Sequence, residues 1–584
     1  MNILGLSCFY HDAGACLLRD GELVAAAEEE RFSRIKHDSR LPLRATMYCL
    51  AAAGLQPGDL DYVIFYEKPL LKFERIVAGY TATYPRSRST FVTALQAWLG
   101  QKLWVRSQIR DALDYDGEIL FGEHHVSHAA SAYFPSPFDE AAVVTADGVG
   151  EWATTTLGVG RGLDLEVTHE IRYPHSLGLL YSAFTAYLGF EVNEGEYKVM
   201  GMAAYGQPTS VDKVRRLVDL CEDGSYRLDL RYFGYQHSLR SIDPAFIELF
   251  GPARQPGADL DQHYADIAAS IQLVTEEAML GLARRARSLS GCSNVCLAGG
   301  VALNVLANAR ILRESGFERV WVQPAAGDAG GCLGAATYLY HSVLRGEHRY
   351  RMDNAYLGPS YSNAEIHAFL DTAGVSYQVL EESHVARIVA GLLADNAVIG
   401  WFQGRMEFGP RALGARSILA NPTDPTMKDA LNAKIKHREA FRPFAPSTLV
   451  EAAPTYFDFG PRVDSPFMLL TARVWPDKQH LLPAITHADG TARVQTVSRS
   501  QNPLYYTLIE EFGKLTGVPV LVNTSFNVAG EPIVCTPEEA FNSFAHTDMD
   551  YLVMGDALIP ASSKRKLSAY PGRTLVHEGV EVVV

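Results

Sequence analysis

The sequence predicts an α/β protein with two domains, a duplicated two-lobe domain over residues 1–350 and an α+β domain over residues 361–584. Three observations support this prediction. A strand–turn–strand pattern at the N-terminus recurs near residue 140, glycine turns follow two later apolar strands, and a polar stretch sets off the C-terminal part. With 584 residues, the chain is also too long to be served by one hydrophobic core.

The N-terminal pattern predicts three antiparallel strands. Asp20-Gly21 stands between the second and third apolar runs and is a strong hairpin signal. The later copy has its first turn at Asp147-Gly148. Two such units, each followed by helical segments, are typical of an actin-like ATPase (ASKHA) core, in which facing turns enclose a phosphate or a metal between two lobes. The apolar runs are 2–7, 15–18 and 22–27 in the first unit and 142–146, 154–159 and 164–169 in the second.

Two further strands lead into glycine turns that suit a nucleotide. They come after a long helical pattern over residues 261–290 and cover residues 294–298 and 320–322. Glycine lets a ligand approach the backbone, and the N-terminus of the helix after the turn presents free N–H groups to an anion. The predicted nucleotide contacts are Gly299, Gly300, Asn304 and Gly330.

Residues 345–363 are polar, rich in Arg, Tyr, Gly and Pro, and typical of a linker. Helices over 363–373 and 382–395 and a strand over 397–402 then predict the α+β domain. Its residues 405–442 carry a local charge of +4 in a chain of net charge −15. Arginines in a turn there, such as Arg411, match phosphate oxygens in shape. Lys428, on the outer face of a predicted helix, is expected to be solvated.

Composition and charge exclude several classes of protein. The net charge of −15 disfavours binding to nucleic acid or to an anionic membrane surface. No stretch approaches the ~20 apolar residues needed to span a bilayer, and no basic segment precedes the first apolar run, so we expect neither a membrane protein nor a secreted one. Eight widely spaced cysteines predict buried thiols and a cytoplasmic location.

His124 and His128 have a spacing that suits metal binding. Alanines follow them, so at i and i+4 of a helix they share one face. His125 occupies the position where zinc proteases have glutamate, which disfavours that mechanism. Asp147 and Asp328 each follow an apolar strand, in turns that would face each other. The four residues form a set suited to Fe²⁺, Mn²⁺ or Zn²⁺, and the alternative from spacing alone is ordinary surface histidines.

Two other features lie near the first turn. His11 would line the cleft between the lobes, where a base of near-neutral pKa is useful. The acidic run Glu28–Glu30 is interpreted as a solvated face.

Many ordered motifs resemble the O-carbamoyltransferases of the nodulation, cephamycin and tobramycin type. The resemblance implies an N-terminal actin-like domain, similar to the tRNA threonylcarbamoyl transferases, and a YrdC-like C-terminal domain. The motifs are GLSCFYHDAGACLL, EEERFSRIKHD, HHVSHAASAYF, EGEYKVMGMAAYG, GGVALN, GDAGGCLGAA, WFQGRMEFGPRALGARSILA, REAFRPFAP, THADGTARVQTV and LVNTSFNVAGEPIVCTP.

The resemblance implies an ATP-dependent reaction with Mg²⁺ as the usual partner of ATP. Carbamoyl phosphate and ATP would form carbamoyladenylate in the C-terminal domain, and an internal route would deliver it to Fe²⁺ in the N-terminal domain. There it would carbamoylate a hydroxyl of a small-molecule acceptor, as in antibiotic tailoring. His124, His128, Asp147 and Asp328 would hold the metal, Lys36 would lie beside the adenylate, and His11 would act on the acceptor hydroxyl. The carbamoyl phosphate and ATP site would comprise Arg411, Arg416, Lys436, Arg442, Arg493, Asn523 and Ser525.

Two other functions fit parts of the sequence. An actin-like small-molecule kinase would use the glycine turns and Asp147, and a nucleotide-switched assembly protein would use ATP only to close the lobes. The kinase leaves the basic second domain without a role, and the assembly protein leaves the His124 and His128 pair without one. The first domain would also fit a tRNA-modifying transferase, although the acidic net charge disfavours RNA binding. Residues 68–116, helical and rich in aromatic and basic side chains, are expected to shape the acceptor pocket or a homodimer contact.

Overall fold

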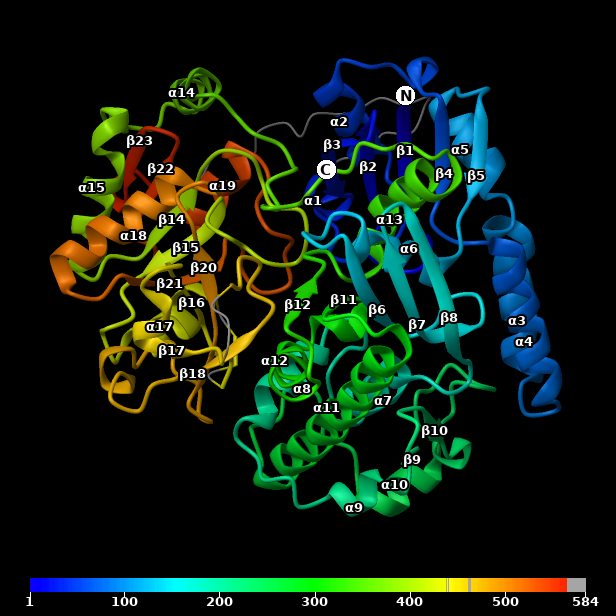
Figure 1. Cartoon of the computed structure of the whole chain (residues 1–584). Coiled ribbons are helices and arrows are strands. Elements are labelled where there is room, and N and C mark those ends of the chain that lie inside the picture. The colour runs from blue at the N-terminus through cyan, green and yellow to red at the C-terminus, as the bar shows by residue number, and fades with distance from the viewer. Residues whose placement is uncertain (437, 440, 461–463, 565–584) are drawn as a thin grey trace.

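The computed structural model describes residues 1–436, 438–439, 441–460 and 464–564, so the final segment of the predicted second domain, 565–584, lies outside the described residues. Figure 1 shows two bodies side by side, the larger formed by the N-terminal part of the chain. None of the helices within the described ranges is long and apolar enough to cross a membrane. All eight cysteines are free, and all but Cys221 are buried.

The first lobe is a five-stranded sheet of order β3-β2-β1-β4-β5. The first three strands pair antiparallel, as the hairpin signal predicts, whereas β1, β4 and β5 run parallel. The parallel neighbours β1 and β4 need a crossover connection, and α2, which links β3 to β4, lies in it. The bounds are β1 (Asn2–Ser7), β2 (Gly14–Arg19), β3 (Glu22–Glu28), α2 (Leu43–Ala53), β4 (Tyr62–Phe65) and β5 (Glu118–Phe121).

The second lobe repeats this plan with a sheet of order β12-β11-β6-β7-β8. Here too the first three strands are antiparallel, and β6, β11 and β12 run parallel. Strand order and direction are therefore the same in both lobes, which confirms the predicted duplication. The bounds are β6 (Glu140–Ala146), β7 (Ala153–Arg161), β8 (Asp164–Arg172), β11 (Asn294–Ala298) and β12 (Arg319–Val322).

Two short helices, α6 (His124–Tyr133) and α13 (Gly331–Tyr338), join the two sheets. They cross so closely that a Cβ on Gly334 would lie 1.7 Å from the carbonyl oxygen of Ser127. Glycine is needed at this contact, since any side chain would push α6 away from the sheet ends. The crossing fixes α6, and with it both histidines, between the lobes.

The remaining helices of the first domain cover its outer faces. The long helix predicted over 261–290 is α11 (Gln262–Ser290), capped by the side chain of Asp261. A helical arm, α3 and α4, runs along the right edge of Figure 1. The bounds are α1 (Glu30–Ser33), α3 (Pro69–Ala82), α4 (Arg88–Ala97), α5 (Val105–Leu113), α7 (Leu177–Tyr187), α8 (Glu196–Ala203), α9 (Val211–Val214), β9 (Val218–Leu220), β10 (Tyr226–Leu228), α10 (Pro244–Phe250) and α12 (Val305–Glu314).

The second domain is a mixed eight-stranded sheet covered by helices on both faces, and it contains both the helices and the strands that the sequence predicted there. Helices α15 and α18 pack together on one face, and α14 and α19 on the other. A small sheet of β17, β18 and β19 adjoins it. The bounds are α14 (Asn363–Thr372), β13 (Gln378–Val379), α15 (Glu382–Ala394), β14 (Ile399–Phe402), β15 (Arg416–Ala420), α16 (Met427–Ala430), β16 (Ala445–Leu449), α17 (Ala453–Tyr456), β17 (Phe457–Asp458), β18 (Thr471–Val474), β19 (Thr491–Arg493), β20 (Gln495–Val497), α18 (Pro503–Thr516), β21 (Val520–Ser525), α19 (Pro537–Ala545), β22 (Tyr551–Met554) and β23 (Ala557–Pro560).

The interpretation of Glu28–Glu30 as a solvated face is wrong, because each of these residues is only 5% exposed. Arg31 pairs with Glu28 at 2.7 Å and with Glu30 at 2.8 Å, and it also donates to the carbonyl oxygen of Gly409 in the second domain. Glu28 in turn accepts from the Gly409 N–H. The acidic run is thus part of the contact between the domains.

Candidate functional site

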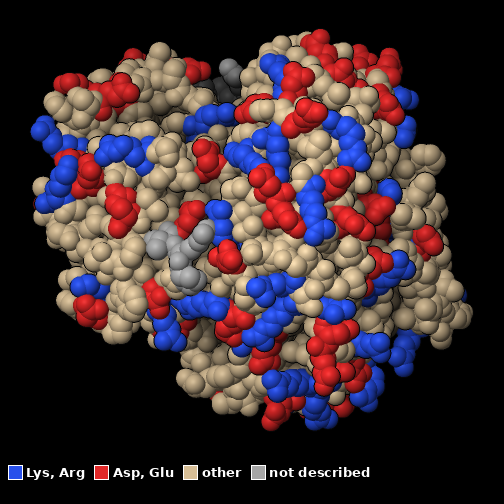
Figure 2. All heavy atoms as spheres, viewed as in Figure 1, with Lys and Arg blue, Asp and Glu red and all other residues tan. Residues whose placement is uncertain are grey.

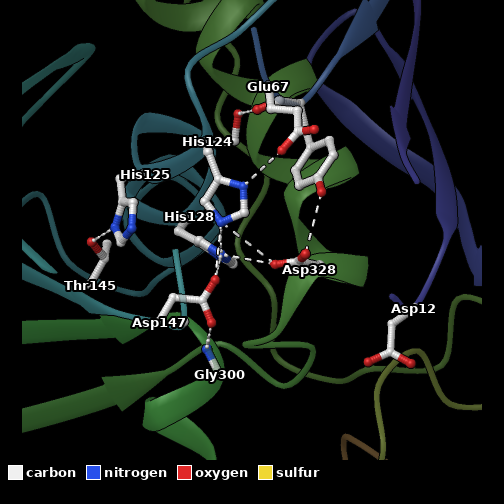
Figure 3. A network of polar contacts seen from close by, with 12 residues as sticks. Asp12, Glu67, His124, His125, His128, Thr145, Asp147, Gly300 and Asp328 are labelled. Carbon is white, nitrogen blue, oxygen red and sulfur yellow. Dashed lines mark hydrogen bonds and ion pairs between the residues drawn. The ribbon is translucent and has the colours of Figure 1, made fainter. Parts of the chain in front are cut away.

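His124, His128, Asp147 and Asp328 converge into one buried cluster, which we call the imidazole–carboxylate tetrad (Figure 3). His124 Nε2 lies 3.0 Å from Asp147 Oδ2, 3.1 Å from His128 Nε2 and 3.6 Å from Asp328 Oδ1. His128 Nε2 is 3.4 Å from each of the same two carboxylate oxygens. The sequence predicted this convergence.

Local structure explains how the tetrad forms. The two histidines lie one turn apart on α6, so their rings share a face. Asp147 follows β6, and Asp328 lies in the turn between β12 and α13. The N–H of Gly300 donates to Asp147 Oδ1, and a Cβ on Gly300 would lie 2.9 Å from that oxygen, so a side chain there would displace the Asp147 carboxylate.

Within the tetrad, contacts between imidazoles and carboxylates shift the pKa values of His124, His128 and Asp147 toward the charged forms. Burial lowers the pKa of His124, but the charge on Asp328 and the contacts with Asp147 and Glu67 outweigh it and raise that pKa to about 10. Contacts with Asp147 and Asp328 raise the pKa of His128 against the effect of burial. Burial raises the pKa of Asp147, but its contacts with the two imidazoles dominate and hold that pKa well below the usual range.

The tetrad fits a divalent metal ion. Its four ligand atoms lie within 4.8 Å of one another, and Asp328 Oδ1 makes no hydrogen bond within the described residues. Separations of 3.0–3.6 Å are those between atoms that share one cation at about 2.1 Å. Two imidazoles and two carboxylates suit Fe²⁺, Mn²⁺ and Zn²⁺.

His11 lies near the tetrad in a chain of hydrogen bonds. Its Nδ1 is 2.9 Å from Asp12 Oδ2, and Nδ1 of His37 is 2.7 Å from the other oxygen of Asp12. Burial lowers the pKa of His11, but the charge on Asp328 and the bond to Asp12 raise it to about 9. A cation in the tetrad would offset the negative charge of Asp328 and so lower the pKa of His11 toward neutrality.

One cavity of about 720 Å³ extends from the tetrad into the second domain. Most of the predicted site residues line it, although they come from both domains. His124, His128 and Asp328 lie behind Asp147, which reaches the cavity wall. The predicted residues in the wall are His11, Lys36, Asp147, Gly300 and Asn304 from the first domain and Arg411, Lys436, Arg442, Arg493, Asn523 and Ser525 from the second.

The far end of this cavity is strongly basic. Burial lowers the pKa of Arg411 to about 10 and, together with the charge of Arg442, that of Arg438 to about 9. Burial and the charges of Arg438, Arg442 and Lys36 lower the pKa of Lys436. Within the described residues, Arg442 has a carboxylate partner, Glu439 at 3.6 Å, and we find no carboxylate paired with Arg411, Lys436 or Arg438.

The basic character is internal to the molecule. Figure 2 shows acidic and basic side chains interspersed over the face in view, without one large region of a single sign. These cations face the cavity rather than the outer surface, and Lys436 Nζ donates there to oxygens of Ser525 and Asn527.

Besides the three tetrad residues behind Asp147, three more predicted residues, Arg416, Gly299 and Gly330, lie outside the cavity wall. Arg416 is fully buried on β15, where its guanidinium donates to the carbonyl oxygens of Gln403, Gly404 and Pro359 and stacks 3.6 Å from the centre of the Phe402 ring. These contacts use it for packing, which corrects the expectation that it lines the ligand site.

Gly299 and Gly330 are required for close backbone packing. Gly299 has φ of +89°, and a Cβ there would lie 2.2 Å from the carbonyl oxygen of Ala146. A Cβ on Gly330 would lie 2.0 Å from the carbonyl oxygen of Ala325. Gly300 and Asn304 are the members of that predicted group that reach the cavity.

Sequence reasoning missed several residues of the wall. Lys428 was expected to be solvated, but it lines the cavity and donates to Oη of Tyr205, a residue of the first domain, at 3.2 Å. Arg438 and His487 line the cavity as well. Arg438 was one of many basic residues in the 405–442 segment, so only the excess of positive charge pointed to it, and His487 was visible only as part of the motif THADGTARVQTV.

The family of the chain follows from comparison with known proteins. Residues 2–337 match the family described as carbamoyltransferase N-terminus, and residues 390–560 match carbamoyltransferase C-terminus. The chain therefore belongs to the carbamoyltransferase family, and it is an enzyme of the transferase class.

The relatives cover nearly the whole chain. An uncharacterized protein of Synechocystis, sll1178, is 49% identical over 96% of this chain and 97% of its own length. Nodulation protein NolNO of Sinorhizobium fredii is 40% identical over 94% of this chain and 79% of its own. Nodulation protein U of Rhizobium tropici is 31% identical over 91% of each.

Proposed function

We propose that this protein is an ATP-dependent O-carbamoyltransferase that uses carbamoyl phosphate and passes through carbamoyladenylate. The observation that supports it is one continuous cavity, with cations that lack carboxylate partners within the described residues at one end and the tetrad at the other. The basic end suits two phosphate-bearing substrates. The tetrad suits the second step, in which a carbonyl group meets a hydroxyl.

In the first step, the basic end would bind carbamoyl phosphate and ATP with its Mg²⁺. Water cleaves carbamoyl phosphate to carbamate and phosphate, and a carbamate oxygen then attacks the α-phosphorus of ATP as pyrophosphate leaves. Arg411, Lys436, Arg442 and Arg493 would hold the phosphates, and Asn523 and Ser525 would hold the carbamoyl group. This role agrees with the proposed YrdC-like character of the second domain.

In the second step, the acceptor hydroxyl attacks the carbamoyl carbon, its proton leaves, and AMP departs as the C–O bond to phosphate breaks. His11 would take the proton at Nε2, since Asp12 holds its Nδ1. Lys36, with Gly300 and Asn304, would hold the AMP phosphate. A metal in the tetrad, Fe²⁺ or otherwise Mn²⁺ or Zn²⁺, supplies Lewis-acid stabilisation of negative charge.

A continuous cavity between the two sites would serve the chemistry of the intermediate. Carbamate is a poor electrophile because its oxygen is a bad leaving group, whereas an adenylate leaves as a phosphate monoester. The same reactivity exposes carbamoyladenylate to water, so a passage within the protein protects it.

One assay tests the proposal. The protein is incubated with ATP, with and without carbamoyl phosphate and acceptor, and pyrophosphate, AMP and ADP are measured. We expect pyrophosphate release that requires carbamoyl phosphate. ADP formation would instead indicate the small-molecule kinase, and nucleotide binding without turnover would indicate the nucleotide-switched assembly protein.

The acceptor is proposed only by class, as a hydroxyl of a secondary metabolite. Aminoglycosides and other sugars, cephem hydroxymethyl groups, macrocycles and aromatic peptide antibiotics all carry such hydroxyls. Screening them for the mass gain of one carbamoyl group would identify the acceptor.

A further inference from the structure

Glu67 and Lys72 form a buried ion pair beside the tetrad. Lys72 Nζ lies 2.6 Å from Glu67 Oε2, and the side chains are only 6% and 5% exposed. Glu67 closely follows β4, and Lys72 lies on α3 with its Nζ 4.8 Å from the centre of the Tyr10 ring. Two buried charges of this kind are costly to desolvate, so their position calls for a reason.

The carboxylate of this pair faces a metal-ligating imidazole. Glu67 Oε2 lies 3.4 Å from Nδ1 of His124, on the ring edge that points away from the tetrad (Figure 3). His124 Nδ1 makes no hydrogen bond within the described residues. A ligating histidine needs its proton on the nitrogen that does not bind the metal, and a carboxylate there fixes both the tautomer and the ring.

The two histidines of the tetrad differ in this respect. Nδ1 of His128 also lacks a hydrogen bond within the described residues, but we find no carboxylate facing it there. The tetrad therefore has one imidazole with a charged support and one without.

We propose that Glu67 is a positioning residue, which accepts from His124 Nδ1 and turns Nε2 toward the metal, while Lys72 holds the Glu67 carboxylate in place. This inference rests on the metal of the proposed function. It assigns a role to the start of the 68–116 segment, which the sequence left between an acceptor pocket and a dimer contact.

A second contact connects the start of the 68–116 segment to α6, the helix that carries His124 and His128. The N–H of Lys68 donates to Glu151 Oε1 at 2.8 Å, and the N–H of His124 donates to the same oxygen at 3.1 Å. Glu151 thus acts on the backbone of α6, whereas Glu67 acts on the ring of His124. Glu151 therefore serves as a matched control, because it is a second buried glutamate that contacts His124, but through the backbone N–H and not the ring.

The test measures metal binding directly. Full-length, metal-stripped protein is titrated with Mn²⁺, and the free ion is followed by electron paramagnetic resonance. For wild type we expect one ion per chain. Glu67→Gln should bind Mn²⁺ about 10–100-fold more weakly, as for other lost partners of ligating histidines. Glu151→Gln should stay within about threefold of wild type, because it does not touch the ring.

The outcomes are distinguishable. If wild type binds no Mn²⁺, the metal of the proposed function is wrong. If wild type binds it and Glu67→Gln binds equally well, or if both glutamate variants weaken binding equally, the positioning role is overturned.

A second variant guards against misfolding of Glu67→Gln. Lys72→Met should weaken Mn²⁺ binding less than the loss of Glu67, because the carboxylate remains. Combined with Glu67→Gln, it should add no further loss. An unchanged affinity in Lys72→Met, or an additive loss in the double variant, contradicts the role given to Lys72.

Discussion

The two ends of the cavity balance charge in opposite ways. In the tetrad, two carboxylates face two imidazoles at 3.0–3.6 Å, so the protein neutralises its own buried charges. At the basic end, Arg411 and Lys436 have no carboxylate partner within the described residues, and burial lowers the pKa of both. The first end is organised before a ligand arrives, whereas the second needs the charge of its substrates.

The comparison predicts that the two half-reactions can be lost separately. His128→Ala removes a tetrad ligand and should lower carbamoyl transfer from supplied carbamoyladenylate by at least about 10³-fold, since the Lewis-acid contribution is lost. Pyrophosphate release should stay near the wild-type rate. Rapid-quench measurement of both steps checks this. Parallel loss of both steps would contradict the separation.

A substitution at the basic end should have the opposite effect and impair the first half-reaction. Arg411→Ala should lower pyrophosphate release by about 10²–10³-fold, because a buried phosphate donor is removed, while transfer from supplied adenylate persists. Arg411→Lys should fall in between, since it keeps the charge but loses the planar fork. The same two assays serve, and equal rates in the Ala and Lys variants would argue against a bidentate role.

Glu29 is a buried carboxylate that belongs to neither end of the cavity, and its titration should make the stability of the protein depend on pH. Burial raises the pKa of Glu29 from 4.5 to about 7, although the N–H groups of Ala45 and Arg44 oppose it. The folded state therefore binds the proton more tightly than the unfolded state. The free energy of unfolding should fall by roughly 3 kcal/mol as the pH rises from 4.5 to 7.

Chemical denaturation at several pH values checks this prediction, with Glu29→Gln as the comparison. The variant should lose this part of the pH dependence. If its pH profile matches that of wild type, Glu29 does not titrate in this range.

The smallest effect concerns stability without ligand. Arg493 lines the cavity, and burial with the charges of Arg411, Arg438 and Arg442 lowers its pKa. Arg493→Met should raise the free energy of unfolding of the ligand-free protein by about 1 kcal/mol, since an unpaired charge is removed. It should also reduce the stabilisation that ATP with carbamoyl phosphate gives to wild type. Thermal unfolding measures both, and a lower melting temperature without ligand would contradict the prediction.

Much of the first domain could be predicted from the sequence, because its signals are local. Asp20-Gly21 marked a hairpin that forms with the expected strands, and α11 covers residues 262–290 against a prediction of 261–290. The tetrad was also within reach. Its histidines are one helical turn apart, and its aspartates follow strands whose ends must meet if the lobes face each other.

Only the tertiary structure decided which charged side chains are buried and with what partners. Glu28–Glu30 resembles a solvated run, yet all three residues are buried: Glu28 accepts from Gly409 of the second domain, and Glu29 accepts from the N–H groups of Arg44 and Ala45. Arg416 looks like a phosphate ligand but donates to backbone carbonyls, and Lys428 looks solvated but lines the cavity. The reason is physical. Strands, turns and helix faces depend on neighbours in sequence, whereas the burial of a charge depends on segments that are far apart in the chain and meet only on folding.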